Sequence, residues 1–440
     1  MKPIRYIALI VLMVYSVHTK AQENRVQFYE NCFLYDSILG FINPEMQIKY
    51  PYINFGENKY VFPSENSPSF KLFFEKFDSL VKLKDRQLNV YHIGGSHIQA
   101  DVYSHRMRIY LQKYADNLKG PRGLLFPFTL AGTNNPYHYK VDSVGKWTGM
   151  RNVIIKDTSR LGLLGMSAST RDILAGFSIY RNKYDTLNHY FNRIKVYHNL
   201  NENYCLHWKD TANVNSIFTD TLAGYTTFHL NNLVDTARFV IYKVGDDTTL
   251  FTTYGVELMN DSPGIIYNSI GVNGASFRSY LRCQDFGKQL KELRPDMFII
   301  SIGTNDANTT FDDFRPDVFR QRYEAMIKTI REANPDCAIL LTVPNDCYYR
   351  GKHINKNTAR MKEVIYELAK QYQYAVWDFY TIMGGQGSSQ KWFTDKLMIR
   401  DKIHFTVEGY RLKGDLFYEA FLKYIDEYEY KRQMIGLGQN

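Results

Sequence analysis

The stretch Leu88-Asn-Val-Tyr-His-Ile-Gly-Gly-Ser-His97 contains a short apolar run that is interrupted by two glycines. The run before Gly94-Gly95 is typical of a β-strand, and the glycines predict a turn. Apolar residues then recur near helical spacing at Ile98, Val102 and Ile109. A strand, a glycine turn and one long helix predict the first unit of an α/β fold.

The same pattern returns in the last third of the chain. Met297–Ile302 is a continuous apolar run between Arg294-Pro295-Asp296 and Gly303, as expected for a parallel strand buried on both faces. Ala338–Val343 and Ala375–Phe379 repeat it with helical segments between them, and a last helix is predicted from about Thr406. We therefore predict an α/β fold with a three-layer, doubly wound parallel sheet.

The segment between these two parts has a different sequence pattern. Short Thr-, Val-, Ile- and Tyr-rich runs alternate with Asn, Asp and Gly clusters, as at Asn152–Lys156, Arg193–Tyr197 and Ala237–Tyr242. This pattern predicts an all-β sandwich inserted into the α/β domain. The predicted organisation is a signal peptide (1–21), an N-terminal extension (22–87), an α/β domain (88–123 plus 264–430), the inserted β-sandwich (124–263) and a C-terminal tail (431–440).

The N-terminus has the pattern of a secretory signal peptide. Lys2 and Arg5 precede the apolar stretch Tyr6–Val17, and Thr19-Lys20-Ala21 supplies small residues for cleavage after Ala21. A single membrane anchor is the alternative, but the apolar stretch is shorter than the ~20 residues that a span needs. We expect an exported protein, periplasmic or secreted, with no stable membrane span after cleavage.

Composition excludes several classes of protein. The 440 residues are 45% hydrophobic and 22% charged, as in a soluble globular protein, and their net charge is +9. Residues 1–21 contain three basic residues and no acidic one, which leaves +6. No run of five or six basic residues occurs, so we expect no nucleic-acid partner.

The cysteines and histidines predict neither a disulfide scaffold nor a metal site. Five cysteines are too few for such a scaffold in an exported chain of this length, although Cys337 and Cys347 are near enough in sequence to pair. No CxxC or HExxH motif is present. We expect no metal and no cofactor, and the oligomeric state stays open.

Four short segments follow predicted strands or precede the last helix, where open α/β sheets place their sites. Taken singly, each is more often a turn, a cap or a surface pair. In this order they supply the groups for acyl transfer: a serine on a strand-to-helix turn, a glycine, an asparagine and an Asp-x-x-His. The segments are Gly94-Gly95-Ser96-His97, Gly271-Val-Asn-Gly274, Gly303-Thr-Asn305-Asp306 and Asp401-Lys-Ile-His404.

This set of segments resembles the four blocks of the SGNH (GDSL-type) hydrolase family, over about residues 88–123 and 262–430. The sequence His92-Ile-Gly-Gly-Ser-His-Ile-Gln-Ala-Asp101 is similar to the branch found in exported bacterial proteins. Gly274 follows Ser96 by 178 positions, which requires an insertion between the first two blocks. Peptidoglycan O-acetylesterases of this family are similar in carrying a carbohydrate-binding-like β-sandwich there.

The resemblance implies a role for each block. Ser96 would be the nucleophile, His404 its base, and Asp401 the partner that orients His404. The Ser96 and Gly274 backbone N–H groups and the Asn305 amide would form the oxyanion hole, with Gly274 preferred to Gly271.

One residue departs from the family pattern. The usual Gly-Asp-Ser reads Gly-Gly-Ser here, and we interpret Gly95 as a residue that can adopt the strained angles of a tight nucleophile turn. The departure also raises the alternative of a catalytically inactive relative.

The predicted function is removal of O-acetyl groups from a glycan, with peptidoglycan as the favoured substrate, through an acyl-enzyme on Ser96. A polysaccharide O-acetyltransferase with the same triad and an inactive glycan-binding protein are the alternatives. Sequence leaves the glycan and the acyl group undetermined. The possible substrate-binding residues are His97, Gln99, Asn134 and Trp392.

Overall fold

The computed structural model describes residues 44–437 except 65, 117, 157–158 and 246–247. The predicted signal peptide and Cys32 lie outside these residues. None of the described helices is long and apolar enough to cross a membrane.

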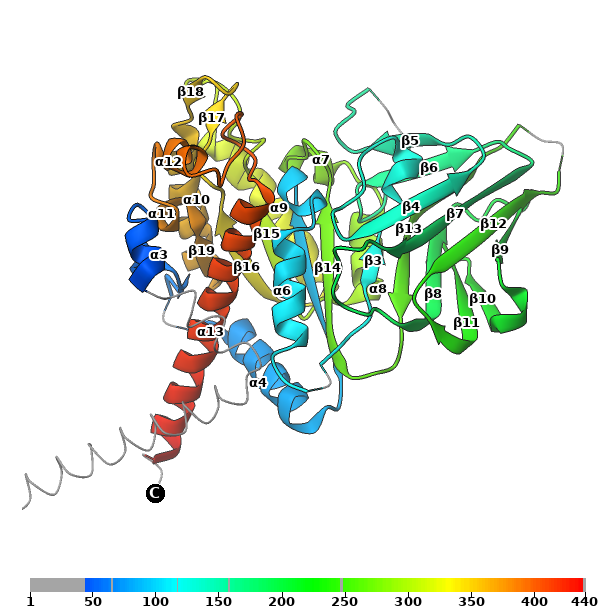
Figure 1. The fold of residues 1–440 in the computed structure, drawn as a ribbon, viewed down its shortest axis with the longest axis horizontal. Coiled ribbons are helices and arrows are strands. Elements are labelled where there is room, and N and C mark those ends of the chain that lie inside the picture. The colour runs from blue at the N-terminus through cyan, green and yellow to red at the C-terminus, as the bar shows by residue number, and fades with distance from the viewer. Residues whose placement is uncertain (1–43, 65, 117, 157–158, 246–247, 438–440) are drawn as a thin grey trace, which may run out of the picture.

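A six-stranded sheet forms the centre of the α/β part of the chain (Figure 1). Five strands are parallel, and the short edge strand β1 pairs antiparallel with β19. The α/β prediction is confirmed for this part. In spatial order the strands are β1 (Tyr60–Val61), β19 (Ala375–Asp378), β16 (Ala338–Val343), β15 (Met297–Ser301), β2 (Gln87–Gly94) and β14 (Gly264–Gly271).

Helices cover both faces of this sheet because successive strand residues point to opposite sides. In β15, Phe298 and Ile300 belong to one buried apolar cluster, while Met297 and Ile299 belong to the other. The first cluster includes α7 (Phe277–Leu281), α8 (Phe286–Leu293), α9 (Pro316–Ala333) and α10 (Asn357–Tyr372). The second includes α4 (Pro68–Leu83), α6 (Tyr103–Gln112), α11 (Phe379–Ile382), α12 (Ser388–Thr394) and α13 (Val407–Leu437).

Two boundaries differ from the sequence-based expectation. Residues 60–61 and α4 belong to the α/β layers, so the described part of the N-terminal extension completes the sheet and its helical cover. Helix α13 continues through residue 430 to Leu437, so most of the predicted tail is helical. Two small elements complete this part: α3 (Pro44–Lys49) and a hairpin of β17 (Tyr348–Tyr349) and β18 (His353–Ile354).

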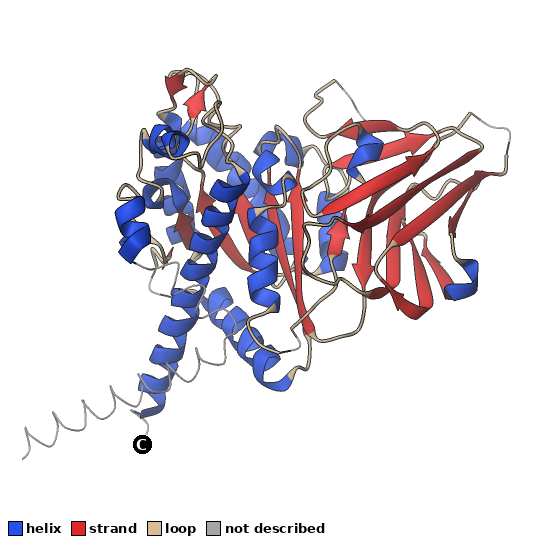
Figure 2. Cartoon of the chain, viewed as in Figure 1, coloured by secondary structure: helices blue, strands red, loops and turns tan. Residues whose placement is uncertain are grey.

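In the segment 124–263, called the insert below, the described regular structure consists mainly of β-strands, which are joined by loops and two short 3-10 helices (Figure 2). All its strand pairs are antiparallel. One sheet contains β10 (Val214–Asp220), β11 (Tyr225–Val234), β8 (Phe191–His198), β13 (Phe251–Met259), β6 (Met166–Thr170) and β5 (Thr148–Arg151), and β3 (Gly123–Leu125) also pairs with β13. The other contains β4 (Tyr139–Val144), β7 (Leu174–Arg181), β12 (Ala237–Lys243) and β9 (Tyr204–Trp208).

Aromatic side chains join the two sheets of the insert. The ring centroids of Phe228 on β11 and Phe239 on β12 lie 6.0 Å apart, and those of Tyr204 on β9 and Phe251 on β13 lie 6.1 Å apart. The predicted strand at Asn152–Lys156 is wrong: β5 ends at Arg151, and the chain turns there because Asn152 N–H bonds back to Gly165.

Candidate active site

The predicted nucleophile lies at the carboxyl end of the central strand β2. Strand β2 ends at Gly94, and Ser96 is the first residue of the short helix α5 (Ser96–Gln99). The Ser96 hydroxyl oxygen lies 2.7 Å from His404 Nε2, although 308 residues separate the two in sequence. The fold therefore brings the first and last predicted blocks into direct contact.

Asp401 orients His404 from the loop before α13. His404 Nδ1 lies 2.7 Å from Asp401 Oδ2, and the other carboxylate oxygen accepts the backbone N–H groups of Ile403 (2.8 Å) and His404 (3.0 Å). A neutral imidazole with its proton on Nδ1 satisfies Asp401 and leaves Nε2 free to accept from Ser96. This is the arrangement that a serine nucleophile and its base require.

The electrostatics of the site keep Asp401 ionised. Burial acts to raise the pKa of Asp401, but the hydrogen bonds from the His404 side chain and from the two backbone N–H groups outweigh it and lower that pKa below its ordinary value. The side chains of His404 and Asp401 remain 35% and 36% exposed, so a substrate can reach them from solvent.

Besides the Ser96 N–H at the start of α5, the predicted oxyanion donors Gly274 and Asn305 lie on two neighbouring loops. Gly274 is exposed, and its φ of +82° is a conformation that favours glycine. Asn305 Nδ2 donates to the Ala275 carbonyl at 2.9 Å, which orients its amide beside the nucleophile turn and leaves its second N–H available. Gly271 is buried, and a Cβ there would lie 2.1 Å from the Gln99 nitrogen, so its role is close packing.

Gly95 does not use the left-handed backbone conformation that favours glycine. Its φ of −94° lies outside the left-handed region. Space is the constraint: a Cβ on Gly95 would lie 3.1 Å from Asn305 Nδ2 and 3.4 Å from the Ala275 carbonyl oxygen. Gly95 therefore allows the Asn305 amide to lie against the nucleophile turn.

Three of the four possible substrate-binding residues are buried. Trp392 is 0% exposed, donates to the Met383 carbonyl and packs against Phe379 and Phe405, so it belongs to the core. His97 lies beneath the site, with Nδ1 2.9 Å from the Tyr410 hydroxyl. Burial removes both from direct contact with a glycan.

Gln99 and Asn134 lie beside the Gly274 loop. Gln99 is 1% exposed, and its amide bonds to other protein groups rather than to solvent. Asn134 is exposed, and its Oδ1 accepts from Asn273 Nδ2 at 2.9 Å. Of the four residues, only Asn134 is placed where a substrate can touch it.

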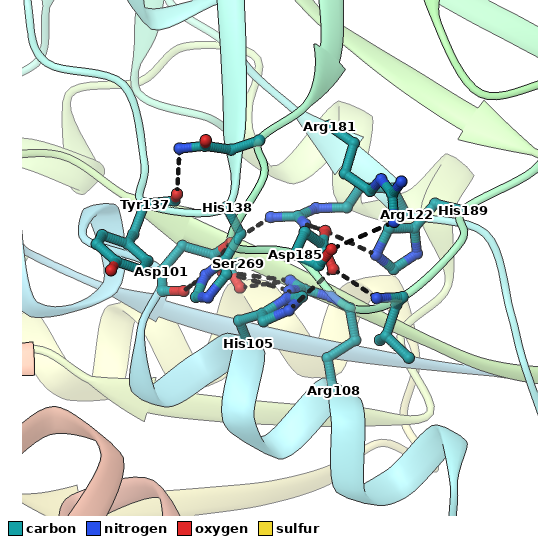
Figure 3. A network of polar contacts seen from close by, with 12 residues as sticks. Asp101, His105, Arg108, Arg122, Tyr137, His138, Arg181, Asp185, His189 and Ser269 are labelled. Carbon is teal, nitrogen blue, oxygen red and sulfur yellow. Dashed lines mark hydrogen bonds and ion pairs between the residues drawn. The ribbon is translucent and has the colours of Figure 1, made fainter. Parts of the chain in front are cut away.

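Sequence reasoning missed a buried polar cluster directly behind the nucleophile helix (Figure 3). His105 of α6 faces Asp185 of the insert, and Arg108 of α6 pairs with Asp101. Arg122 forms ion pairs with both Asp101 and Asp185. The members of the cluster come from four separate parts of the chain (101–108, 122, 138 and 185–189), so no single local spacing identifies the whole set. The cluster consists of Asp101, His105, Arg108, Arg122, His138, Asp185 and His189.

Burial and charge pairing set the protonation of this cluster. Burial lowers the pKa of His138 and of His189 to about 4, and that of His105 well below its ordinary value. Burial alone would raise the pKa of Asp101, but the Arg122 and Arg108 guanidiniums hold it well below its usual range. Near neutral pH the cluster is therefore two carboxylates with two guanidiniums and three neutral imidazoles.

Two groups of three residues in this cluster have possible ligand atoms that lie close enough together to surround one cation. They are Asp101–His105–His138 and His105–Asp185–His189, whose donor atoms lie within 4.8 Å of one another. Arg108 donates to His105 Nδ1 at 2.7 Å, which places the single proton of a neutral imidazole on Nε2, facing Asp185. Since the guanidiniums already balance both carboxylates, the arrangement favours an ion-paired cluster over a metal site.

The described cysteines are free thiols. Cys205, Cys283, Cys337 and Cys347 form no disulfide, so the pairing of Cys337 with Cys347 that the sequence left open is not made in this structure.

Part of the chain matches a known protein family. Residues 242–412 match the GDSL-like lipase/acylhydrolase family. This segment therefore belongs to a GDSL-like lipase/acylhydrolase domain. No curated protein matches the sequence.

Solved structures show how far the likeness of fold extends. A structure described as a peptidoglycan O-acetylesterase has 18% identity and a TM-score of 0.68, over 84% of this chain and 99% of that one. That share exceeds the two predicted α/β segments together, so the likeness includes β-structure of the insert. An acetyl xylan esterase (20% identity, TM-score 0.29, 36% and 80% covered) and a lipase/acylhydrolase from Enterococcus faecalis (23%, 0.28, 38% and 77%) match over a smaller part of the chain.

Proposed function

We propose that this GDSL-family hydrolase is an exported esterase that removes O-acetyl groups from peptidoglycan. The observation that carries the proposal is the continuous hydrogen-bonded chain from Ser96 through His404 to Asp401, open to solvent beside Gly274 and Asn305. The likeness in fold to a peptidoglycan O-acetylesterase supports this choice of glycan. Export rests on the signal-peptide pattern of residues 1–21.

The proposed reaction has two stages. His404 Nε2 accepts the proton of the Ser96 hydroxyl as its oxygen attacks the acetyl carbonyl, and Asp401 stabilises the imidazolium. The Ser96 and Gly274 N–H groups and the Asn305 amide bind the oxyanion. As the bond between the acetyl carbon and the sugar oxygen breaks, His404 returns the proton to that oxygen, which leaves as a hydroxyl. Water, activated by His404, then attacks the acetyl-enzyme and releases acetate.

The insert is proposed to act as a domain that holds the glycan near Ser96. Its two antiparallel sheets and their position between the first two blocks support this role. Asn134, exposed beside the Gly274 loop, is the insert residue proposed to contact substrate first.

Acetate release from O-acetylated peptidoglycan, acetylated xylan and an acetylated capsular glycan tests this function. Ser96→Ala should lower release by about 10⁴-fold or more because no nucleophile remains. The exposed Ser143, replaced in Ser143→Ala, is the matched control and should leave the rate unchanged.

The alternatives give different results in the same assay. Faster release from xylan or the capsular glycan would contradict peptidoglycan as the preferred substrate. Transfer of acetate to an added glycan faster than its release would identify a transferase. A folded protein that binds glycan but is not labelled at Ser96 by a fluorophosphonate would show the inactive binding protein.

A further inference from the structure

Gln99 joins the nucleophile helix to the loop that contains Gly274. It is the last residue of α5, three residues after Ser96, and it is 1% exposed. Its Oε1 accepts the backbone N–H of Asn273 at 2.7 Å, and its Nε2 donates to Thr133 Oγ1 and to the Asn134 carbonyl, both at 3.1 Å. Both amide N–H groups and the carbonyl of this side chain are therefore bonded to protein.

The loop held by Gln99 is a tight turn. Ala275 N–H donates to the Val272 carbonyl at 2.9 Å, which closes a four-residue turn with Asn273 and Gly274 at its centre. Gly274 has a φ of +82°, whereas Asn273 is not among the residues with positive φ. A positive φ at the third position alone defines a type II turn.

The type of this turn decides where the Gly274 N–H points. Types I and II differ by a rotation of the central peptide, which here joins Asn273 to Gly274. Rotation to type I would turn the Gly274 N–H to the opposite side of the loop. The Gly274 N–H can donate to the oxyanion in every catalytic cycle only if the turn is held in the type II form.

Two further hydrogen bonds connect the nucleophile helix and the Gly274 turn to the insert, one of them from Asn273 itself. Its Nδ2 donates to Asn134 Oδ1 at 2.9 Å, while the Asn134 carbonyl accepts from Gln99. The neighbouring Tyr137 N–H donates to the Ala100 carbonyl at 3.0 Å, directly after α5. The insert thus contacts both sides of the joint between the nucleophile helix and the Gly274 turn.

We infer that Gln99 and Asn134 are positioning residues that hold the 272–275 turn so that the Gly274 N–H faces the oxyanion. The inference rests on the oxyanion role given to Gly274 in the proposed function. It assigns the insert a part in catalysis besides holding glycan, because Thr133 and Asn134 anchor the Gln99 amide. It also explains why Gln99, expected to touch substrate, is buried.

Steady-state kinetics on p-nitrophenyl acetate test this inference independently of the natural glycan. Gln99→Met keeps the size of the side chain and removes its hydrogen bonds. We expect kcat to fall about 10- to 100-fold with KM within about twofold, since loss of one oxyanion donor costs ~10²–10³. Rates are expressed per active site, counted by complete fluorophosphonate labelling, so that unfolded protein does not lower kcat.

Asn134 supplies a second variant on an exposed residue, in case Gln99→Met does not fold. Asn134→Ala should lower kcat severalfold, and Asn134→Asp should restore it because a carboxylate oxygen still accepts from Asn273. The double variant should lose less than the product of the two single effects, because both act on one turn. Gln321→Ala and Asn231→Ala, at exposed positions, are the matched controls.

The outcomes separate the two proposals. A kcat per labelled site within twofold of wild type in both Gln99→Met and Asn134→Ala would overturn the positioning role alone. A wild-type protein that hydrolyses the aryl ester but not acetylated peptidoglycan would contradict peptidoglycan as the substrate. The kcat values of Gln99→Met and Asn134→Ala on the aryl ester would still decide the positioning role. A wild-type protein with neither ester hydrolysis nor Ser96 labelling would overturn both.

Discussion

At the scale of single residues, Gly95 decides how closely Asn305 approaches the nucleophile. The family pattern has Asp at this position, and its replacement raised the alternative of an inactive protein. In the structure the Ser96–His404–Asp401 chain is complete beside Gly95. The glycine leaves room for the Asn305 amide, so its presence is compatible with catalysis.

This arrangement predicts that restoring a side chain at Gly95 is harmful. A Cβ would lie 3.1 Å from Asn305 Nδ2, so Gly95→Ala should displace the amide and lower kcat on an aryl acetate about tenfold, and Gly95→Asp should lower it at least as much. Gly56→Ala, where no atom lies within 4 Å of the added Cβ, is the control. An increase in kcat for Gly95→Asp would show that the family aspartate fits this site.

The site residues could be predicted from sequence because each block has a local signature. Ser96, Asn305 and the Asp401–His404 pair lie at strand ends or before the last helix, where acyl-transfer groups recur. Trp392 shows the limit of such reasoning. Its neighbours in sequence indicate a loop, whereas burial between Phe379 and Phe405 depends on segments that meet only in the fold.

At the scale of elements, the helix after the nucleophile is broken where one long helix was predicted. Helix α5 ends at Gln99 and α6 begins at Tyr103, and Asp101 between them has a φ of +51°. Asp is one of the few residues that enter the left-handed region readily. Its carboxylate is then placed between Arg108 and Arg122, an arrangement that apolar periodicity cannot reveal.

Removing this buried charge should destabilise the protein strongly. Asp101→Asn keeps the backbone preference but leaves two buried guanidiniums with one carboxylate, Asp185, and we expect the free energy of unfolding in urea to fall by about 3–5 kcal/mol. Asp312→Asn, at an exposed position, is the control. A loss below about 1 kcal/mol would mean that solvent or a rearranged partner compensates the guanidiniums.

At the scale of the whole molecule, the insert and the hydrolase layers share one core. A single cluster of buried apolar residues runs from Phe177 and Phe228 in the insert to Phe277 and Ile327 under the central sheet. The polar cluster around Asp101 and Asp185 joins the same two parts of the chain (Figure 3). The insert is contiguous with the catalytic layers through both apolar and polar contacts.

Buried histidines predict that this molecule loses stability in mild acid. Burial lowers the pKa of His138, His189 and His198 to about 4, whereas an unfolded histidine titrates near 6.5. Between pH 6.5 and 4 the unfolded chain therefore binds more protons. Each such histidine lowers the free energy of unfolding by about 1.4 kcal/mol per pH unit in that window.

Thermal unfolding measured from pH 7 to pH 4 checks this effect. Tm should fall steadily below pH 6.5. In His189→Gln the fall of Tm with pH should be less steep, because unfolding then takes up one proton fewer. His353→Gln, at an exposed position, should keep the wild-type slope. A Tm that is constant from pH 6.5 to 4.5 would show that these imidazoles take up protons without cost.

The sequence by itself determined the class of fold, the candidate catalytic groups and the presence of a β-rich insert. Those features rest on local order: strand periodicity, glycine turns and four blocks in a fixed succession. Only the tertiary structure decided that Gly95 makes room for Asn305, that Gln99 holds the turn containing Gly274, and that α6 and the insert share a charged cluster. These features depend on contacts between separate segments of the chain, such as Gln99 with Asn273, Gly95 with Asn305 and His105 with Asp185, which local spacing does not encode.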